Sequence, residues 1–197
     1  MDNDTLLERA ASAEPGSIER TLWIVALVQA LLERRVVLIG GAAHNLYTGD
    51  YRPTDIDLAA SGVGRAAFEL LGAAGFLDRG PGHRHIELRL GEAEFPDLIE
   101  FPTNLDGIDS TDTIALTDGV SVEVISLSDL IVDRLIQATD GTSLTFDDAV
   151  ALLVATYGDI DWQVVDRLVE RRSLDPMLIE LPTVLQRVRA VAKEALR

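Results

Sequence analysis

The sequence predicts an α+β protein in which a mixed sheet flanked by helices occupies residues 1–125 and a C-terminal helical bundle occupies residues 126–197. Short apolar runs bounded by glycine or proline recur through the first region, as expected of strands. A segment with helical apolar spacing, IERTLWIVALVQALLERR, precedes them and is expected to be the N-terminal helix of that region. After Ser126 only helical spacing remains, which indicates a separate helical region.

Composition limits the classes of function. The 197 residues are 47% hydrophobic, which is enough for one substantial core. The absence of cysteine excludes disulfides and cysteine nucleophiles and fits a cytoplasmic location, and the acidic N-terminus does not resemble an export signal. The most apolar run, 22–32, is shorter than the ~20 residues needed to span a bilayer, so no membrane partner is expected. A net charge of -16 argues against long duplex DNA as a ligand.

The first elements are predicted from caps and breakers. Ser17 is a suitable N-cap for the helix that ends near residue 35. A buried strand is expected over 36–39, where Gly40-Gly41 ends it, and the segment AAHNLYTG is compatible with a helix that stops at Gly49. Pro53 keeps the chain extended ahead of a second strand over 55–59.

The later elements follow the same reasoning. A short amphipathic helix is expected over 64–75, two antiparallel strands over 85–90 and 95–101, and a further strand over 120–125. Ser126 and Asp129 form a capping box ahead of helices at about 127–138, 146–157 and 160–172. Asp175 is expected to cap a turn, and Pro182 to break or kink the chain before a last helix that reaches Arg197.

The first motif with chemical meaning is Gly40-Gly41. A strand that ends in two glycines at a helix start lets backbone amides approach a ligand, and a helix N-terminus favours an anion such as a triphosphate. The alternative is a tight strand-to-helix turn that needs glycine only for packing.

The second motif is the pair Asp55 and Asp57. Two residues apart on a predicted strand, their carboxylates leave the same face and can share a hard divalent cation. A solvated strand end is the alternative, but Ile56 and Leu58 indicate that the opposite face is buried.

A third carboxylate is expected from a neighbouring strand, because two-metal phosphoryl transfer uses several carboxylates to bridge cations. The segment FPDLIEF offers Asp97 and Glu100, which face opposite sides of a regular strand, so only one can join the site. Glu100 is favoured because it follows Leu98-Ile99 within an apolar run, whereas Asp97 follows Pro96 near the strand start.

Several cationic or histidine side chains are further candidates. Arg52 lies just before the aspartate pair and suits a γ-phosphate, although an ion pair with one of the many acids explains it equally well. His44 follows the glycines closely enough to approach a nucleotide, yet a lone histidine on a short helix is more often structural. His83 and His85 flank Arg84 in a small positive group that suits a substrate, and a surface strand end explains it as well.

These residues carry a family resemblance. The segment VVLIGGAAHNLYTGDYRPTDIDLA resembles the polymerase-β-type nucleotidyltransferase superfamily, in which a strand, Gly-Gly or Gly-Ser, a short helix and Asp-x-Asp follow one another. Its end, RPTDID, is similar to small AbiEii-like toxins and minimal nucleotidyltransferases. The segments LIEFP and VEVISLSDLIVDRL resemble an uncharacterised branch, which also favours Glu100. The resemblance covers roughly residues 36–157.

The resemblance implies Mg²⁺ or Mn²⁺, a nucleoside triphosphate donor and transfer of a nucleotidyl group to a hydroxyl of a small molecule, a protein or tRNA. The catalytic and metal-binding residues it implies are Asp55, Asp57 and Glu100, with Asp97 as the alternative third acid. The nucleotide-binding residues it implies are Gly40, Gly41, Arg52 and Thr54. Gly41 replaces a serine that many active members use. The C-terminal helices are expected to bind substrate or to form an oligomer.

Two other functions are compatible with parts of this pattern. The same fold can serve as a catalytically inactive nucleotide- or protein-binding module, such as a toxin–antitoxin component that binds an antitoxin or a second copy of itself. A phosphatase of the haloacid-dehalogenase type also uses Asp-x-Asp, but its nucleophile ends the first strand without a preceding Gly-Gly turn, so the order of elements argues against it.

Overall fold

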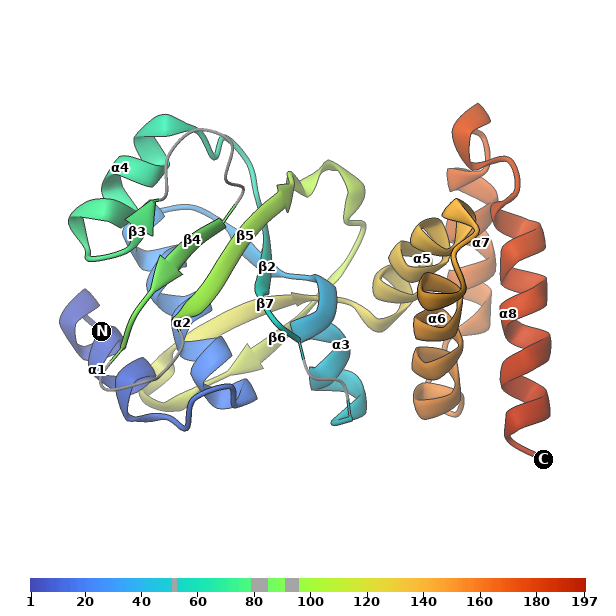
Figure 1. Cartoon of the computed structure of the whole chain (residues 1–197), viewed down its shortest axis with the longest axis horizontal. Helices are drawn as coiled ribbons and strands as arrows, with labels where there is room; N and C mark the ends of the chain where they lie inside the picture. Colours follow the sequence, from blue (N-terminus) through green and yellow to red (C-terminus); the bar gives the residue numbers. More distant parts are fainter. Residues whose placement is uncertain (51–52, 79–84, 91–95) are drawn as a thin grey trace. The chain divides into compact units, whose positions relative to one another are not determined.

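The computed structural model describes residues 1–50, 53–78, 85–90 and 96–197 (Figure 1). The chain forms two compact units, Met1–Ile125 and Ser126–Arg197. The first unit holds a mixed sheet and helices, and the second is helical, so the α+β class is confirmed.

A seven-stranded sheet organises the first unit, in the order β3-β4-β5-β2-β1-β7-β6. Strand β2 pairs antiparallel with β1 and parallel with β5, while β1 pairs parallel with β7. The antiparallel pairing of β4 with β5 confirms the two strands expected there. The strands are β1 (Val36–Leu38), β2 (Ile56–Ala60), β3 (Leu77–Asp78), β4 (His85–Leu88), β5 (Asp97–Thr103), β6 (Thr111–Ala115) and β7 (Ser121–Ile125).

Helix α2 (Ile18–Leu32) is the central helix of this unit. It contacts β1, β7, α1 (Asn3–Ser12), α3 (Gly40–Thr48) and α4 (Arg65–Ala73). Apolar residues around most of its circumference are buried, among them Ile24 and Val28, which are fully inaccessible. Burial on several sides explains why the segment lacks the polar face of a surface helix. Two 3₁₀ turns, Leu105–Gly107 and Thr117–Gly119, complete the unit.

The second unit consists of helices α5 (Leu127–Gln137), α6 (Ser143–Thr156), α7 (Trp162–Arg172) and α8 (Leu181–Ala195), with 3₁₀ turns at Ala138–Asp140 and Pro176–Leu178. Their apolar residues form a separate core in which α6 packs against α5 and α8. The Ser126 hydroxyl accepts a hydrogen bond from the Asp129 amide, as the capping box predicted. Among the described residues, the helices are all too short or too polar to cross a membrane.

The structure differs from the predicted elements at several places. Helix α1 and strands β3 and β6 were not predicted, because α1 is mostly polar, β3 has two residues, and β6 is an edge strand without a buried residue. Helix α3 already begins at Gly40, and β2 begins at Ile56, so Asp55 directly precedes the strand. Pro182 neither breaks nor kinks a helix, since it lies in the first turn of α8. Amides in the first turn make no hydrogen bond within the helix, so proline, which has no amide hydrogen, is tolerated there.

The ion pair of Arg35 with Glu123 predicts a pH dependence of stability. Hydrogen bonds from the Arg35 guanidinium, the shortest 2.6 Å, are the main reason that the pKa of Glu123 lies below its usual 4.5. A lowered pKa in the folded state stabilises the protein above the unfolded pKa, and this stability disappears as the pH falls through the folded value. Both side chains are partly exposed, so we expect Arg35→Gln to reduce the free energy of unfolding by less than about 1 kcal/mol at pH 7. Urea unfolding of both proteins at pH 7 and at a pH well below 4.5 tests this, and an undiminished difference at the acidic pH would contradict it.

Candidate metal centre

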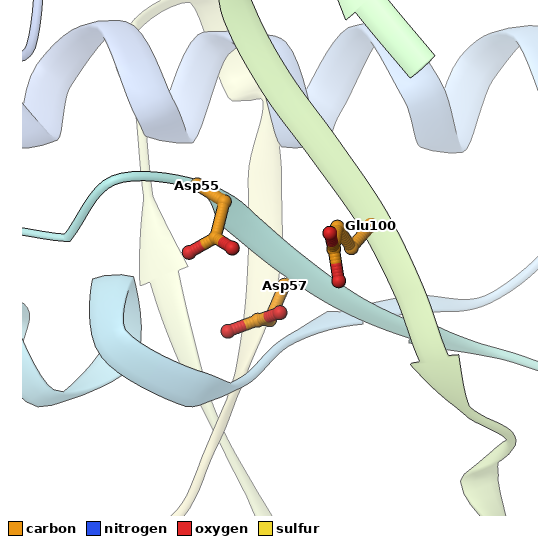
Figure 2. Close-up of side chains that lie close together, drawn as sticks. All are labelled: Asp55, Asp57 and Glu100. Carbon is orange, nitrogen blue, oxygen red and sulfur yellow. The ribbon is translucent and has the colours of Figure 1, made fainter. Parts of the chain in front are cut away.

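Three carboxylates meet on adjacent strands of the sheet. Asp55 directly precedes β2, Asp57 lies within it, and Glu100 lies opposite Asp57 on β5. One oxygen from each side chain lies within 4.8 Å of one oxygen from each of the others (Figure 2). All three residues are half-buried, so the group borders solvent.

Alternation along β5 sends the two candidate third acids to opposite faces. Glu100 shares a face with Asp57, whereas Asp97 shares the other face with the fully buried Ile99. There Asp97 forms an ion pair with Arg20 of α2 at 2.6 Å. The structure thus brings Glu100 to the aspartate pair and places Asp97 in a different contact.

Gly40 joins the aspartates to the start of α3. Its φ of +64° is a left-handed conformation that glycine adopts most readily, and a Cβ at this position would overlap the Asp57 carboxylate. The Ile39 amide also donates a hydrogen bond to the Asp57 carbonyl oxygen at 3.0 Å. The first turn of α3, which includes the buried Gly41, therefore begins beside an acid of the cluster. Because the first amides of a helix lack intrahelical partners, this position favours an anion.

Strand β4 contributes two further side chains to the face that carries the cluster. His85 lies opposite Glu100, and its Nδ1 is 3.8 Å from a Glu100 oxygen. Glu87 follows two residues later on the same face and is only 5% exposed. His85 was a candidate for substrate contact, whereas Glu87 was not predicted to lie near the site. The only sequence signal for Glu87 was an acid in an apolar strand, HIEL.

Of the remaining predicted site residues, some are described in the structure and others are not. Thr54 is exposed next to Asp55, and His44 is buried in α3. Arg52, His83 and Arg84 lie outside the described residues.

A cavity of about 350 Å³ opens beside the cluster. Asp55 and Thr54 lie in its wall, and so do Arg20 and Asp97 from the neighbouring ion pair. Pro15, Pro53 and Pro96 supply apolar surface. Its volume is near the lower end of the range for small-molecule sites, ~300–1,000 Å³.

The donor set has the chemistry of a site for a hard cation. Carboxylate oxygens are the ligands that Mg²⁺ and Mn²⁺ prefer, and three of them from adjacent strands leave coordination positions for water or a phosphate. Without a cation, three like charges so close together repel one another. The group therefore fits a divalent metal ion.

Comparisons with known proteins identify the fold. An antigenic nucleotidyltransferase-like protein from Paracoccidioides brasiliensis has a similar structure, with a TM-score of 0.51 and 15% identity over 93% of each chain. The antibiotic-resistance factor ANT(2'')-Ia matches with a TM-score of 0.42 and 16% identity, over 99% of this chain and 97% of that one. No family model and no curated protein matches the sequence. The chain therefore has a nucleotidyltransferase-like fold, as the sequence resemblance implied.

The contact of Gly40 with Asp57 predicts a large effect of Gly40→Ala. Gly49 provides a matched control, because its φ is +72° but a Cβ there meets no atom within 4 Å. We expect Gly49→Ala to reduce the free energy of unfolding by about 1–2 kcal/mol, the cost of a left-handed alanine. Gly40→Ala should cost more, since it also displaces the Asp57 carboxylate. Urea unfolding measures both, and equal losses would show that the contact with Asp57 contributes nothing.

Proposed function

We propose that this protein is a nucleotidyltransferase that uses Mg²⁺ or Mn²⁺ to move a nucleotidyl group from a nucleoside triphosphate to a hydroxyl acceptor. The observation that carries the proposal is the meeting of Asp55, Asp57 and Glu100, with one oxygen of each within 4.8 Å of the others, on a nucleotidyltransferase-like fold. An acidic cluster alone would be weak support. Its place beside a glycine turn at a helix N-terminus gives the cluster a neighbouring position for phosphates.

Each group has a distinct role in this proposal. Asp55, Asp57 and Glu100 hold the metal. The amides of Gly40 and Gly41 at the start of α3 bind the triphosphate, because the first amides of a helix have no partner within the helix and the helix dipole favours negative charge there. Thr54 and, as a sequence-based prediction, Arg52 contact the nucleotide from the segment that precedes Asp55.

The reaction consists of one displacement at phosphorus. The acceptor hydroxyl oxygen forms a bond to the α-phosphorus, the bond from that phosphorus to the bridging oxygen breaks, and pyrophosphate leaves. A carboxylate of the cluster takes the hydroxyl proton. A divalent cation held by the three acids would neutralise negative charge on the transferred and leaving groups. The three acids are half-buried, so both substrates would approach them from the solvent side.

The acceptor is proposed from charge and size. A net charge of -16 disfavours a long polyanion, and the cavity beside Asp55 matches a small molecule. A hydroxyl of a small molecule or of a protein is therefore preferred over tRNA. The helical unit Ser126–Arg197 is a further candidate for binding a substrate or a second copy of the chain.

The metal site predicts the effect of removing each carboxylate. We expect Asp55→Asn, Asp57→Asn and Glu100→Gln each to lower Mn²⁺ affinity by at least about tenfold. Loss of a residue that only orients a metal ligand already lowers affinity by roughly 10–100-fold, and each of these variants removes a ligand itself. Glu69→Gln is the control, since Glu69 is an exposed acid on α4. Calorimetric titration with Mn²⁺, with and without each nucleoside triphosphate, makes the measurement. Wild-type affinity in all three variants would contradict the metal centre.

Transfer itself needs a separate experiment. Incubation with α-labelled nucleoside triphosphates and candidate acceptors, including small hydroxylated compounds, whole-cell protein and tRNA, should give a labelled product that the Asp57→Asn variant does not form. Metal-dependent nucleotide binding without any labelled product would instead support a non-catalytic nucleotide-binding module.

A further inference from the structure

We propose that the ion pair of Arg20 and Asp97 is a positioning pair that fixes the register of β5, and so holds Glu100 opposite Asp57. The proposal rests on the proposed function in so far as Glu100 is a metal ligand. Its structural part, the register of two strands, is independent of that function and is tested separately.

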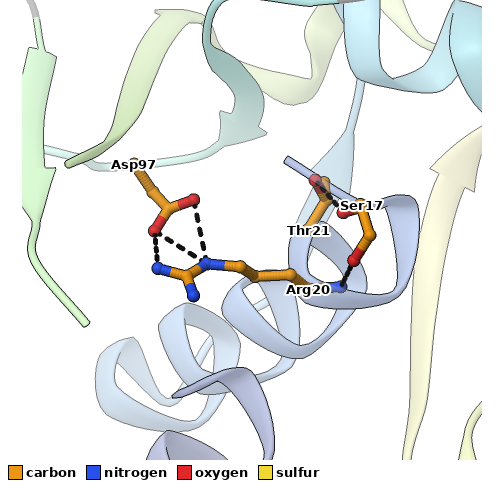
Figure 3. Close-up of polar contacts among 4 residues, drawn as sticks. All are labelled: Ser17, Arg20, Thr21 and Asp97. Carbon is orange, nitrogen blue, oxygen red and sulfur yellow. Dashed lines mark hydrogen bonds and ion pairs between the residues drawn. The ribbon is translucent and has the colours of Figure 1, made fainter. Parts of the chain in front are cut away.

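The pair has a rigid, directional geometry (Figure 3). Arg20 donates from Nε to both Asp97 oxygens, at 3.2 and 3.0 Å, and from Nη2 to Oδ2 at 2.6 Å. The two side chains are only 2% and 14% exposed, so water screens the contact little. A forked contact of this kind fixes both the distance and the orientation of a carboxylate.

Arg20 is itself firmly held at the start of α2. Its amide donates to the Ser17 hydroxyl at 3.2 Å, which caps the helix, and the Thr21 hydroxyl donates to the Ser17 carbonyl oxygen at 3.3 Å. The rest of α2 is packed into the core of the first unit. The backbone of Arg20 is therefore held in place, and its guanidinium extends from there to β5.

The position of Asp97 on β5 gives the contact its significance. Asp97 is the first residue of the strand and lies three residues before Glu100. Because neighbouring residues of a strand face opposite sides, a slip of one residue would turn Glu100 away from Asp57 and toward the core. Fixing Asp97 on the core face therefore fixes Glu100 on the other.

The pairing of β2 with β5 is irregular beyond Glu100, so the register there depends on the pairs before Glu100, on the four pairs with β4 and on the contact of Arg20 with Asp97. Asp57 lies opposite Glu100, but Ala59 lies opposite Thr103, so β5 has one extra residue between Glu100 and Thr103. One of the residues in this irregular stretch is Pro102, which has no amide hydrogen for the ladder. Beyond Glu100, the hydrogen bonds between β2 and β5 therefore do little to fix the register of the two strands. The contact of Phe101 with Phe68 of α4 is apolar and fixes orientation less strictly.

The pair also keeps the charge of Asp97 away from the cluster. Asp97 and Asp55 border the same cavity, so an unpaired Asp97 would add a fourth negative charge nearby. With Arg20 bound to it, the Asp97 carboxylate is neutralised on the core side of the sheet.

The ion pair of Arg35 and Glu123 offers a control with the same contact geometry but greater exposure, 49% and 30% against 2% and 14%. It is also forked, with Nε contacts of 3.0 and 3.1 Å and an Nη2 contact of 2.6 Å, and it also links chain segments distant in sequence. Glu123 lies on β7, however, which is separated from β2 by β1. Loss of this pair removes a similar contact without touching β5.

The first measurement is Mn²⁺ affinity. We expect Arg20→Gln to weaken Mn²⁺ binding at least about tenfold, the usual cost of losing a group that orients a metal ligand, and Arg35→Gln to leave it unchanged. Since Arg20→Gln leaves a buried carboxylate without its cation, the double variant Arg20→Gln with Asp97→Asn is measured too, because it removes both charges and should fold more readily. It is expected to bind Mn²⁺ weakly as well. Full affinity in a folded double variant would overturn the proposal.

The second measurement reads the register without metal. The chain has no cysteine, so Asp57→Cys with Glu100→Cys introduces a single thiol pair. Strand neighbours ~4.8 Å apart fall within the range that a disulfide can bridge. We expect oxidation to cross-link these thiols efficiently, and the yield to fall several-fold when Arg20→Gln is added but not when Arg35→Gln is added.

The two measurements separate the possible failures. If the starting protein binds no Mn²⁺ but Arg20→Gln lowers the cross-link yield, the proposed function fails and the positioning pair stands. If Arg20→Gln leaves the cross-link yield unchanged, the positioning pair is overturned, whatever happens to Mn²⁺ affinity.

Discussion

The carboxylate of Asp57 lies against the bare Cα of Gly40, and much of the candidate site depends on this contact. It requires glycine at a left-handed position, and it joins the strand that carries two acids to the helix that presents amides. The hydrogen bond from Ile39 to the Asp57 carbonyl reinforces the same junction. A negative cluster and an anion-binding turn thereby become neighbours, an arrangement that is favourable when a cation lies between them.

The sheet solves a second problem, which is the placement of several negative charges close together. β2 and β5 are neighbouring strands with Asp57 opposite Glu100, so the third acid lies next to the aspartate pair. The other face of the same strands carries Ile56 and Ile99, whose burial holds the strands in place. Apolar burial on one face therefore offsets like-charge repulsion on the other, and a bound cation would relieve that repulsion.

Much of this arrangement could be predicted from the sequence, for physical reasons that are local. The turn at Gly40, the shared face of Asp55 and Asp57 and the opposite facing of Asp97 and Glu100 follow from backbone conformation and strand alternation. The edge strand β6 could not be predicted in the same way, since it has no buried residue and depends on pairing with β7. Arg20 was also missed, because an arginine in an apolar helix carries no sign of its distant partner.

The sequence by itself determined the elements of the candidate site: a glycine turn, an aspartate pair on one strand face and two acids of which only one could join them. Only the tertiary structure decided that Glu100 lies beside the pair, that Asp97 binds Arg20, and that His85 and Glu87 share the face of the cluster. Local rules fix which way a side chain leaves its own strand. The neighbours that it meets depend on strand order, register and helix packing, which bring together residues as far apart as Arg20 and Asp97.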